Sequence, residues 1–238
     1  LAGNDRRPAK CGGFFMNISI FDILGPVMIG PSSSHTAGAQ RIGKAMHMIC
    51  GGEEVAWVKF YLHGSFSHTL SGHGTDRALV AGLMGMDASD ARIKTSLEIA
   101  KEKGMEIEFE PADLGDVHPN TVKVAAKTKS GREYTMIGSS VGGGEVEIVE
   151  IDGIPAKVSG KFPAIIITHE DRLGVIGRIT STLAENKINI VTVRHSREKK
   201  GGTATTMIET DQPIPQEVKE TLEGPEYIQH VVTIAKFA

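Results

Sequence analysis

The sequence is poor in cysteine: its 238 residues include only Cys11 and Cys50. Two cysteines cannot build a disulfide framework, and such sparse use is typical of a reducing compartment. They are also too few for a four-cysteine zinc site or for the ligand set of an iron–sulfur cluster. The chain alone is therefore not expected to hold a cysteine-ligated metal centre.

The sequence also lacks the features of a membrane, secreted or nucleic-acid-binding protein. No apolar run approaches the roughly 18–20 residues of a membrane span, and residues 1–15 lack the apolar core of a signal peptide. A net charge of −3 with only 5% aromatic residues gives no basic, aromatic surface for nucleic acid. We expect a cytoplasmic protein with no membrane and no nucleic-acid partner, in which residues 1–15 are a disordered extension.

The apolar content, 40% of the residues, is enough for two modest domains. Residues 16–152 are predicted to form a mixed α/β domain whose strands are largely antiparallel. Glycine, proline and the absence of periodicity mark residues 153–161 as a linker. The strands expected in the first domain are 55–62, 105–110, 121–128, 133–139 and 145–151, and the helices are 35–49, 75–84 and one between Ser89 and Gly104.

Residues 162–238 contain the order strand, helix, strand, strand, helix, strand, which is a ferredoxin-like βαββαβ unit. The fold class is therefore α+β. A sheet with helices on one face leaves edges and an open face, which pairing with a second copy would cover. The predicted elements are 162–168, 174–186, 188–197, 203–210, 215–222 and 228–234.

The most polar segment, residues 30–41, lies directly before or at the start of a predicted helix. Gly30 and Pro31 favour a turn, and apolar residues at three- and four-residue steps predict the helix. Free N–H groups and the helix dipole at this end favour a bound carboxylate or phosphate. Simple N-capping is the alternative interpretation, but five consecutive polar residues exceed what a cap needs. The candidates are Ser32, Ser33, Ser34, His35 and Thr36.

A second polar segment, residues 63–76, also lies between an apolar strand and a helix start, so both segments could open onto one pocket. A zinc site of His68, His73 and Asp76 is conceivable. It is disfavoured because no His-x₃-His pair shares a helix face and few carboxylates lie nearby. Proton transfer by a histidine is the preferred interpretation.

Three glycines at 142–144 follow Ser139 and Ser140, but the Lys-Ser/Thr of a phosphate-binding P-loop is missing. A bulged turn is favoured on spacing, with close approach of the backbone to a ligand as the alternative. In the second domain, Gly174 lies in the turn between a strand and a helix, where its neighbours' N–H groups suit a carboxylate.

These segments carry a resemblance to a known family. Residues 19–38, 64–76 and 138–144 closely resemble motifs of the beta chains of iron–sulfur-dependent L-serine dehydratases (L-serine ammonia-lyases) of the two-chain bacterial form. The likeness covers residues 16–238, and residues 162–236 resemble an ACT domain, a module that often senses amino acids.

The resemblance implies a lyase subunit of serine catabolism and gluconeogenesis, which converts L-serine to pyruvate and ammonia without pyridoxal phosphate. The family's [4Fe-4S] cluster would be held by three cysteines of a partner alpha chain, with no metal ligand in this chain. The ACT domain is expected to dimerise. A non-catalytic, amino-acid-sensing regulatory subunit is the alternative.

The resemblance also implies residue roles. His73 is the preferred proton-handling residue and His35 its rival; some relatives have a second histidine at the position of Gly74, so the base stays open. Many relatives have proline where this chain has Leu173. The substrate-binding residues would be Ser32, Ser33, Ser34, Thr36, Thr75, Asp76, Ser140, Gly142, Gly143 and Gly144. The effector-binding residues would be His169, Asp171, Gly174, Val175 and Asn189.

Overall fold

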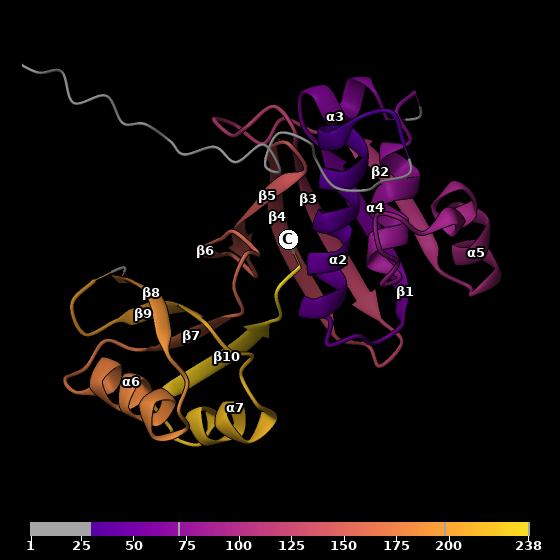
Figure 1. Cartoon of the computed structure of the whole chain (residues 1–238). Coiled ribbons are helices and arrows are strands. Elements are labelled where there is room, and N and C mark those ends of the chain that lie inside the picture. Colours follow the sequence, from indigo (N-terminus) through magenta and orange to yellow (C-terminus); the bar gives the residue numbers. More distant parts are fainter. Residues whose placement is uncertain (1–29, 71, 198, 238) are drawn as a thin grey trace, which may run out of the picture.

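The computed structural model describes residues 30–70, 72–197 and 199–237 (Figure 1). The predicted extension 1–15 lies outside the described residues, as does the first part of the motif at 19–38. The described residues form two β-sheets with helices, in agreement with the predicted α+β class.

The first sheet has six strands in the order β2-β1-β3-β4-β5-β6. The β1–β2 pair is parallel and the other pairs are antiparallel, so the largely antiparallel prediction is confirmed. Buried and less buried residues alternate along β5, as expected of a strand with one face on the core. The strands are β1 Val55–Leu62, β2 Glu106–Pro111, β3 Thr121–Thr128, β4 Glu133–Gly142, β5 Glu145–Ile151 and β6 Ile154–Val158.

Two helices, α2 (Ala39–Ile49) and α4 (Thr75–Leu83), lie together on one face of this sheet (Figure 1). Their backbones approach closely at glycine: a Cβ atom on Gly82 would lie 1.9 Å from the Gln40 carbonyl oxygen. This contact joins the first turn of α2 to the last turn of α4. The remaining helices are η1 Ser33–Gly38, α3 Ser65–His68, η2 Ala91–Thr95 and α5 Ser96–Glu102.

The structure corrects three expectations for this domain. The helix predicted over 35–49 begins earlier, because η1 already includes Ser33. The polar loop 63–76 contains the short helix α3. The segment 153–161 is not simply a linker, because it contains strand β6, which pairs with β5. Positive φ angles at Asp152 (49°) and Gly153 (78°) allow the tight turn that returns the chain to the sheet.

The second domain has the predicted βαββαβ order, with an antiparallel sheet in the order β10-β7-β9-β8. Alternate residues of its strands face opposite sides: Ile165 and Ile167 pack with the helices, whereas Ala164 and Ile166 join the core of the first domain. The elements are β7 Ala164–Glu170, α6 Val175–Glu185, β8 Ile190–Arg197, β9 Thr203–Thr210, α7 Gln216–Glu223 and β10 Ile228–Ile234.

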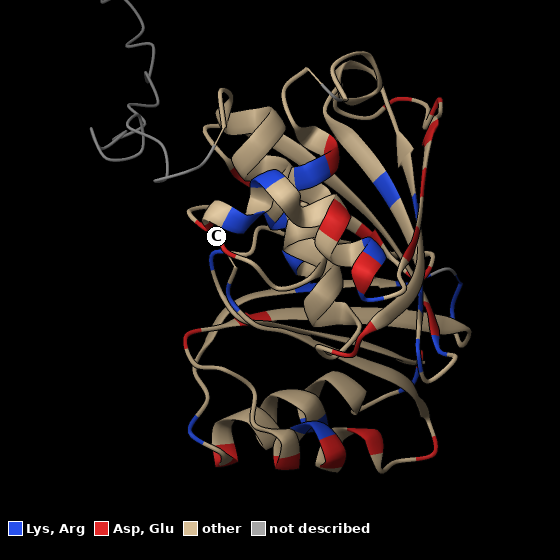
Figure 2. Ribbon diagram, turned by 90° about the vertical axis from the view of Figure 1, so that its right-hand side faces the viewer, with Lys and Arg blue, Asp and Glu red and all other residues tan. Residues whose placement is uncertain are grey.

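The second sheet lies between its own two helices and the first domain (Figure 2). Strand β10 contacts α2, and the buried residues Met207, Ile234 and Phe237 extend the core of the first domain. Helix α2 therefore begins at the polar segment 30–41 and also contacts the second domain. No helix in the described ranges is long and apolar enough to cross a membrane.

Candidate functional site

The polar segment at 30–41 leads into the helix: residues 30–32 precede it, Ser33–Gly38 is η1, and α2 begins at Ala39. The Ser32 side chain is the N-cap and accepts a hydrogen bond of 3.2 Å from the His35 backbone N–H. Ser33 and Ser34 belong to η1 and stay partly exposed, whereas Thr36 is buried. One serine is enough for the cap, so the other hydroxyl groups remain available for other partners.

His35 is held by hydroxyl groups from both polar segments. Its Nε2 atom lies 2.9 Å from Ser65 Oγ, which is 30 residues away in sequence, and its Nδ1 atom lies 3.2 Å from Ser32 Oγ. The ring also packs edge-on against Phe66, with 5.5 Å between ring centroids. Burial, and then the nearby charge of His73, lower the pKa of His35, which favours the neutral imidazole.

His73 lies beside His35, with ring centroids 5.1 Å apart and an interplanar angle of 69°. The Thr36 hydroxyl donates to the His73 carbonyl oxygen at 3.2 Å, which joins the two polar segments directly. His73 Nδ1 is buried and has no hydrogen-bond partner among the described residues. His35 thus has both ring nitrogens engaged, whereas His73 has a nitrogen to spare.

Two further candidates, Thr75 and Ser140, are fully buried and have hydroxyl oxygens without a partner in the described part of the chain. Buried polar groups are usually satisfied, so each exception calls for an explanation. Ser140 packs tightly on the first polar segment, because a Cβ atom on Gly38 would lie 2.1 Å from Ser140 Oγ. Strand β4 thus brings a third segment to the two that carry the histidines.

The remaining first-domain candidates have local structural partners. Gly142, Gly143 and Gly144, all with positive φ, form a bulged turn between β4 and β5, so the bulged-turn interpretation is confirmed. Arg41 Nη1 donates to the Gly144 carbonyl oxygen at 2.6 Å and ties this turn to α2. Asp76 lies in the first turn of α4, where its carboxylate accepts from the Arg77 N–H and suits the helix dipole.

A surface cleft opens where the two polar segments meet. It includes two basic residues, Arg77 and Lys94, that the sequence argument did not select. The one signal for Arg77 was its position directly after the motif at 64–76, and nothing in the sequence pointed to Lys94. The cleft is lined by Gly30, Pro31, Thr36, Gly72, His73, Gly74, Arg77, Ile93 and Lys94.

The described residues do not provide a metal site of their own. No three His, Cys, Asp or Glu side chains in these ranges gather as metal ligands. His68, one member of the conceivable zinc trio, instead places its Nδ1 atom 2.7 Å from the Gly64 carbonyl oxygen. Cys50 does not fit as a cluster ligand, because it is fully buried and burial raises the pKa of its thiol to about 12.

In the second domain, the side chains selected around the β7–α6 turn have partners within the domain. His169 is buried, with Nε2 lying 2.9 Å from Thr206 Oγ1 and Nδ1 lying 2.7 Å from the Glu170 carbonyl oxygen. Asn189 donates to Asp211 at 2.5 Å through its side chain. Both ring nitrogens of His169 and the amide nitrogen of Asn189 are therefore engaged within the domain.

Asp171 is also engaged, by the Gly201 N–H and the Arg197 guanidinium, each at 3.0 Å. These bonds, the backbone one first, lower the pKa of its carboxyl group. Gly174 has φ 85° and precedes α6, whose first residue, Val175, is buried. What this turn leaves for a ligand is therefore the backbone rather than the selected side chains.

Comparison with known proteins assigns both regions. The family model "Serine dehydratase beta chain" matches residues 19–103, and the model "ACT domain" matches residues 164–224. The chain is 44% identical over 221 residues to the "Probable L-serine dehydratase, beta chain" of Bacillus subtilis (strain 168). The aligned region covers 92% of this chain and 98% of that protein.

Two other relatives extend this result. The "L-serine dehydratase, beta chain" of Peptoniphilus asaccharolyticus is 42% identical over 209 residues, covering 87% of this chain and 94% of that protein. The "D-3-phosphoglycerate dehydrogenase" of Methanocaldococcus jannaschii is 28% identical over 178 residues, covering 71% of this chain but only 32% of that protein.

Proposed function

The chain belongs to the family of serine dehydratase beta chains, and we propose that it forms, with an alpha chain, a cytoplasmic L-serine dehydratase. The enzyme would convert L-serine to pyruvate and ammonia, a step of serine catabolism that can supply gluconeogenesis. In this assignment the beta chain binds the substrate and handles its α-proton.

The observation that carries the proposal is that the polar segments 30–41 and 63–76 meet at one cleft. At this meeting point the Nδ1 atom of His73 has no hydrogen-bond partner among the described residues. His35 and His73 lie side by side, and Thr36 bridges their segments. Elimination from serine requires removal of a weakly acidic α-proton, and a positioned histidine is the usual group for that step. His73 suits this role better than His35, whose ring nitrogens both have hydroxyl partners.

The hydroxyl groups around the histidines suit the polar groups of an amino acid. Ser33 and Ser34 are partly exposed on the same turn as His35. Thr75 and Ser140 have unpartnered hydroxyl oxygens next to these segments. We assign to Ser32 and Thr36 the role of holding the two polar segments together. The other hydroxyl groups, those of Ser33, Ser34, Thr75 and Ser140, would contact the substrate.

The family's [4Fe-4S] cluster would be on the alpha chain, because the described residues of this chain do not fit it: Cys50 is a buried, protonated thiol. When bound, such a cluster supplies a Lewis acid for the leaving hydroxyl. The contribution of the beta chain is then to bind, orient and deprotonate.

The test is co-expression of the chain with its alpha chain under anaerobic conditions, followed by assay of pyruvate and ammonia with L-serine. We expect both products in equal amounts from the pair and none from either chain alone. L-Serine binding without turnover by a pair that carries an intact cluster would contradict the proposal and favour a non-catalytic sensing subunit.

For the ACT domain we propose pairing of two copies along the edge strand β8. Val191 and Val193 on β8 are 40% and 44% exposed, and Leu173 next to α6 is fully exposed. Edge strands with apolar side chains are prone to pair with another strand. Val193→Lys should shift the purified protein to half its mass in light scattering, whereas an unchanged mass would contradict this contact.

Effector binding at the same domain is a separate proposal, in which L-serine would use the N–H groups at the start of α6 behind Gly174. Its support is the helix N-terminus, which suits a carboxylate, and the left-handed conformation of Gly174. His169, Asp171 and Asn189 would then shape the loop through their internal bonds, with Val175 anchoring it in the core.

A further inference from the structure

Two cations from distant parts of the sequence line the cleft beside His73. Arg77 comes from the first turn of α4, and Lys94 comes from η2. Both side chains are exposed. Within the described ranges neither forms an ion pair, whereas the nearby cations Lys44 and Arg92 are paired with Asp87 and Asp90. The cleft is thus lined by two cations without an ion-pair partner among the described residues.

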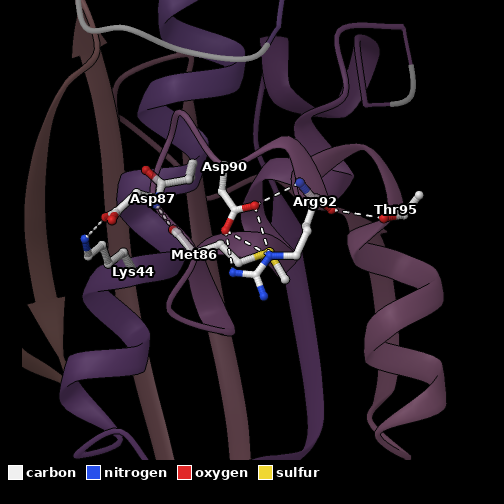
Figure 3. A network of polar contacts seen from close by, with 7 residues as sticks. Lys44, Met86, Asp87, Asp90, Arg92 and Thr95 are labelled. Carbon is white, nitrogen blue, oxygen red and sulfur yellow. Dashed lines mark hydrogen bonds and ion pairs between the residues drawn. The ribbon is translucent and has the colours of Figure 1, made fainter.

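The segment that carries Lys94 is anchored rather than loose. The Asp90 side chain caps η2 by accepting from the Arg92 N–H at 2.9 Å. Figure 3 shows the Asp90 carboxylate facing the Arg92 guanidinium, with bonds of 2.6 to 3.1 Å, and Thr95 bonded to the Arg92 carbonyl oxygen. These bonds fix the backbone on both sides of Lys94.

A single hydrogen bond joins this segment to the first turn of α4. The Ser96 hydroxyl, fully buried, donates to the Arg77 carbonyl oxygen at 2.7 Å. The backbones of Arg77 and Lys94 are therefore parts of one hydrogen-bonded unit and are held in place, while the long side chains of both residues can extend over the cleft.

The Asp76 carboxylate accepts from the Arg77 backbone N–H, but the Arg77 guanidinium itself has no ion-pair partner among the described residues. A cation in the first turn of a helix lies at the positive end of the helix dipole, and here Lys94 adds a second positive charge at the same cleft. A bound carboxylate would offset both charges. The arginine guanidinium can donate two parallel hydrogen bonds to a carboxylate, and the lysine ammonium adds a compact positive charge. Both groups commonly bind carboxylates in proteins.

We propose that Arg77 and Lys94 bind the α-carboxylate of the amino-acid substrate and thereby direct its α-carbon toward His73. This inference rests on the proposed dehydratase function and names the residues that select an amino acid over its amide, which lacks the carboxylate. Gly30, Pro31 and Thr36 of the first polar segment line the same cleft, beside the Ser-rich turn that would contact the remaining polar groups of the substrate.

The test uses the alpha–beta pair and compares Arg77→Gln and Lys94→Gln with Lys101→Gln, a cation on the exposed surface of α5 outside the cleft. For Arg77→Gln we expect KM for L-serine to rise about ten- to a hundredfold with little change in kcat, as for loss of charge-assisted hydrogen bonds that act on binding. Lys94→Gln should raise KM several-fold, by roughly three- to tenfold. Arg77→Lys should recover part of the loss.

A second measurement excludes a purely structural effect of the substitutions. L-Alanine and L-alaninamide, which cannot lose a hydroxyl group, serve as competitive inhibitors with and without a carboxylate. The wild-type pair should prefer L-alanine, and Arg77→Gln should lose most of this preference, whereas a fold defect would weaken both inhibitors alike.

The outcomes separate the two claims. An active wild-type pair whose KM and inhibitor preference are unchanged in both Arg77→Gln and Lys94→Gln would overturn this inference alone. A wild-type pair with an intact cluster that makes no pyruvate would overturn the proposed function and this inference with it.

Discussion

Both domains of this chain have a polar turn ahead of a helix, but the polar groups of the two turns differ in how fully they are hydrogen-bonded within the chain. In the first domain, His73 Nδ1 and the hydroxyl oxygens of Thr75 and Ser140 are buried without partners in the described residues. In the ACT domain, His169 and Asp171 are both bonded within the domain. A similar sequence pattern therefore produces one site with three such atoms and one turn whose His169 and Asp171 are bonded. Beside that turn a single hydroxyl oxygen, on Thr168 of β7, is buried without a partner in the described residues.

This difference has an energetic meaning. An unpartnered buried polar group destabilises a fold by about 1–3 kcal/mol, so three such atoms in one place call for partners, which ordered water, a ligand or a partner chain can supply. The internally bonded groups of the ACT turn stabilise their own loop and have little left to offer. This difference is consistent with the proposal that the substrate binds at the first domain, whereas the ACT turn would offer a ligand its backbone N–H groups.

After the loss of His73 itself, the largest predicted effect concerns the hydroxyl groups that hold the His35 ring. His35→Ala removes the ring that joins Ser32 and Ser65 and packs on His73 and Phe66. We expect kcat of the alpha–beta pair to fall by about a hundredfold, the scale of a misplaced reacting group. Steady-state kinetics at saturating L-serine measure it. Activity within about threefold of wild type would show that the site does not depend on these contacts.

A smaller effect is expected on the free energy of unfolding, which should change in opposite directions when a helix glycine is replaced in each of the two domains. Gly82→Ala places a Cβ atom 1.9 Å from the Gln40 carbonyl oxygen at the α2–α4 contact, whereas a Cβ atom on Gly177 in α6 meets nothing within 4 Å. Gly82→Ala should lower the free energy of unfolding by about 1–3 kcal/mol, and Gly177→Ala should raise it by about 1 kcal/mol through helix propensity. Urea unfolding of both variants measures the difference. Equal shifts of the same sign would contradict the packing account.

The smallest predicted effect is a pH dependence of stability that belongs to His35. Its pKa in the folded protein lies below the ordinary value of 6.5, because burial and the charge of His73 disfavour the protonated ring. The unfolded chain therefore binds the proton more tightly, and stability should fall as the pH drops below about 6.5. Urea unfolding at several pH values should show a shallower acid loss for His35→Gln than for wild type. Parallel curves would contradict the shifted pKa.

The sequence predicted most of the fold because hydrophobic periodicity determines it locally. The bounds of β3, β5, β9 and β10 match the predicted ranges, and the βαββαβ order was fully predicted. Strand β6 was missed because its Pro155 and the flanking Gly153 and Gly160 are typical of a linker, and because its pairing with β5 is a tertiary contact. Helix α3 was missed because a single turn of Ser, Phe, Ser and His has no periodicity to detect.

The candidate site was predictable in its segments but not in its contacts. The polar runs identified His35, His73 and Thr75 as candidates, since residue type and position before a helix carry that information. The bond between His35 and Ser65 depends on how two distant segments fold together. Lys94 could not be found from its surroundings in sequence, because only the anchoring of η2 against α4 brings it to the cleft.

The most direct test of the central claim is the rate of pyruvate formation by three variants of the alpha–beta pair with intact clusters. His73→Ala should lose about 10²–10⁴-fold in kcat, as expected for loss of a proton-transfer group. His68→Ala, on an exposed ring that bonds its own helix, and Asp171→Asn in the ACT turn should stay within about threefold of wild type. Substantial pyruvate formation by His73→Ala, or a loss in Asp171→Asn as large as that expected for His73→Ala, would contradict the assignment of the chemistry to the first domain.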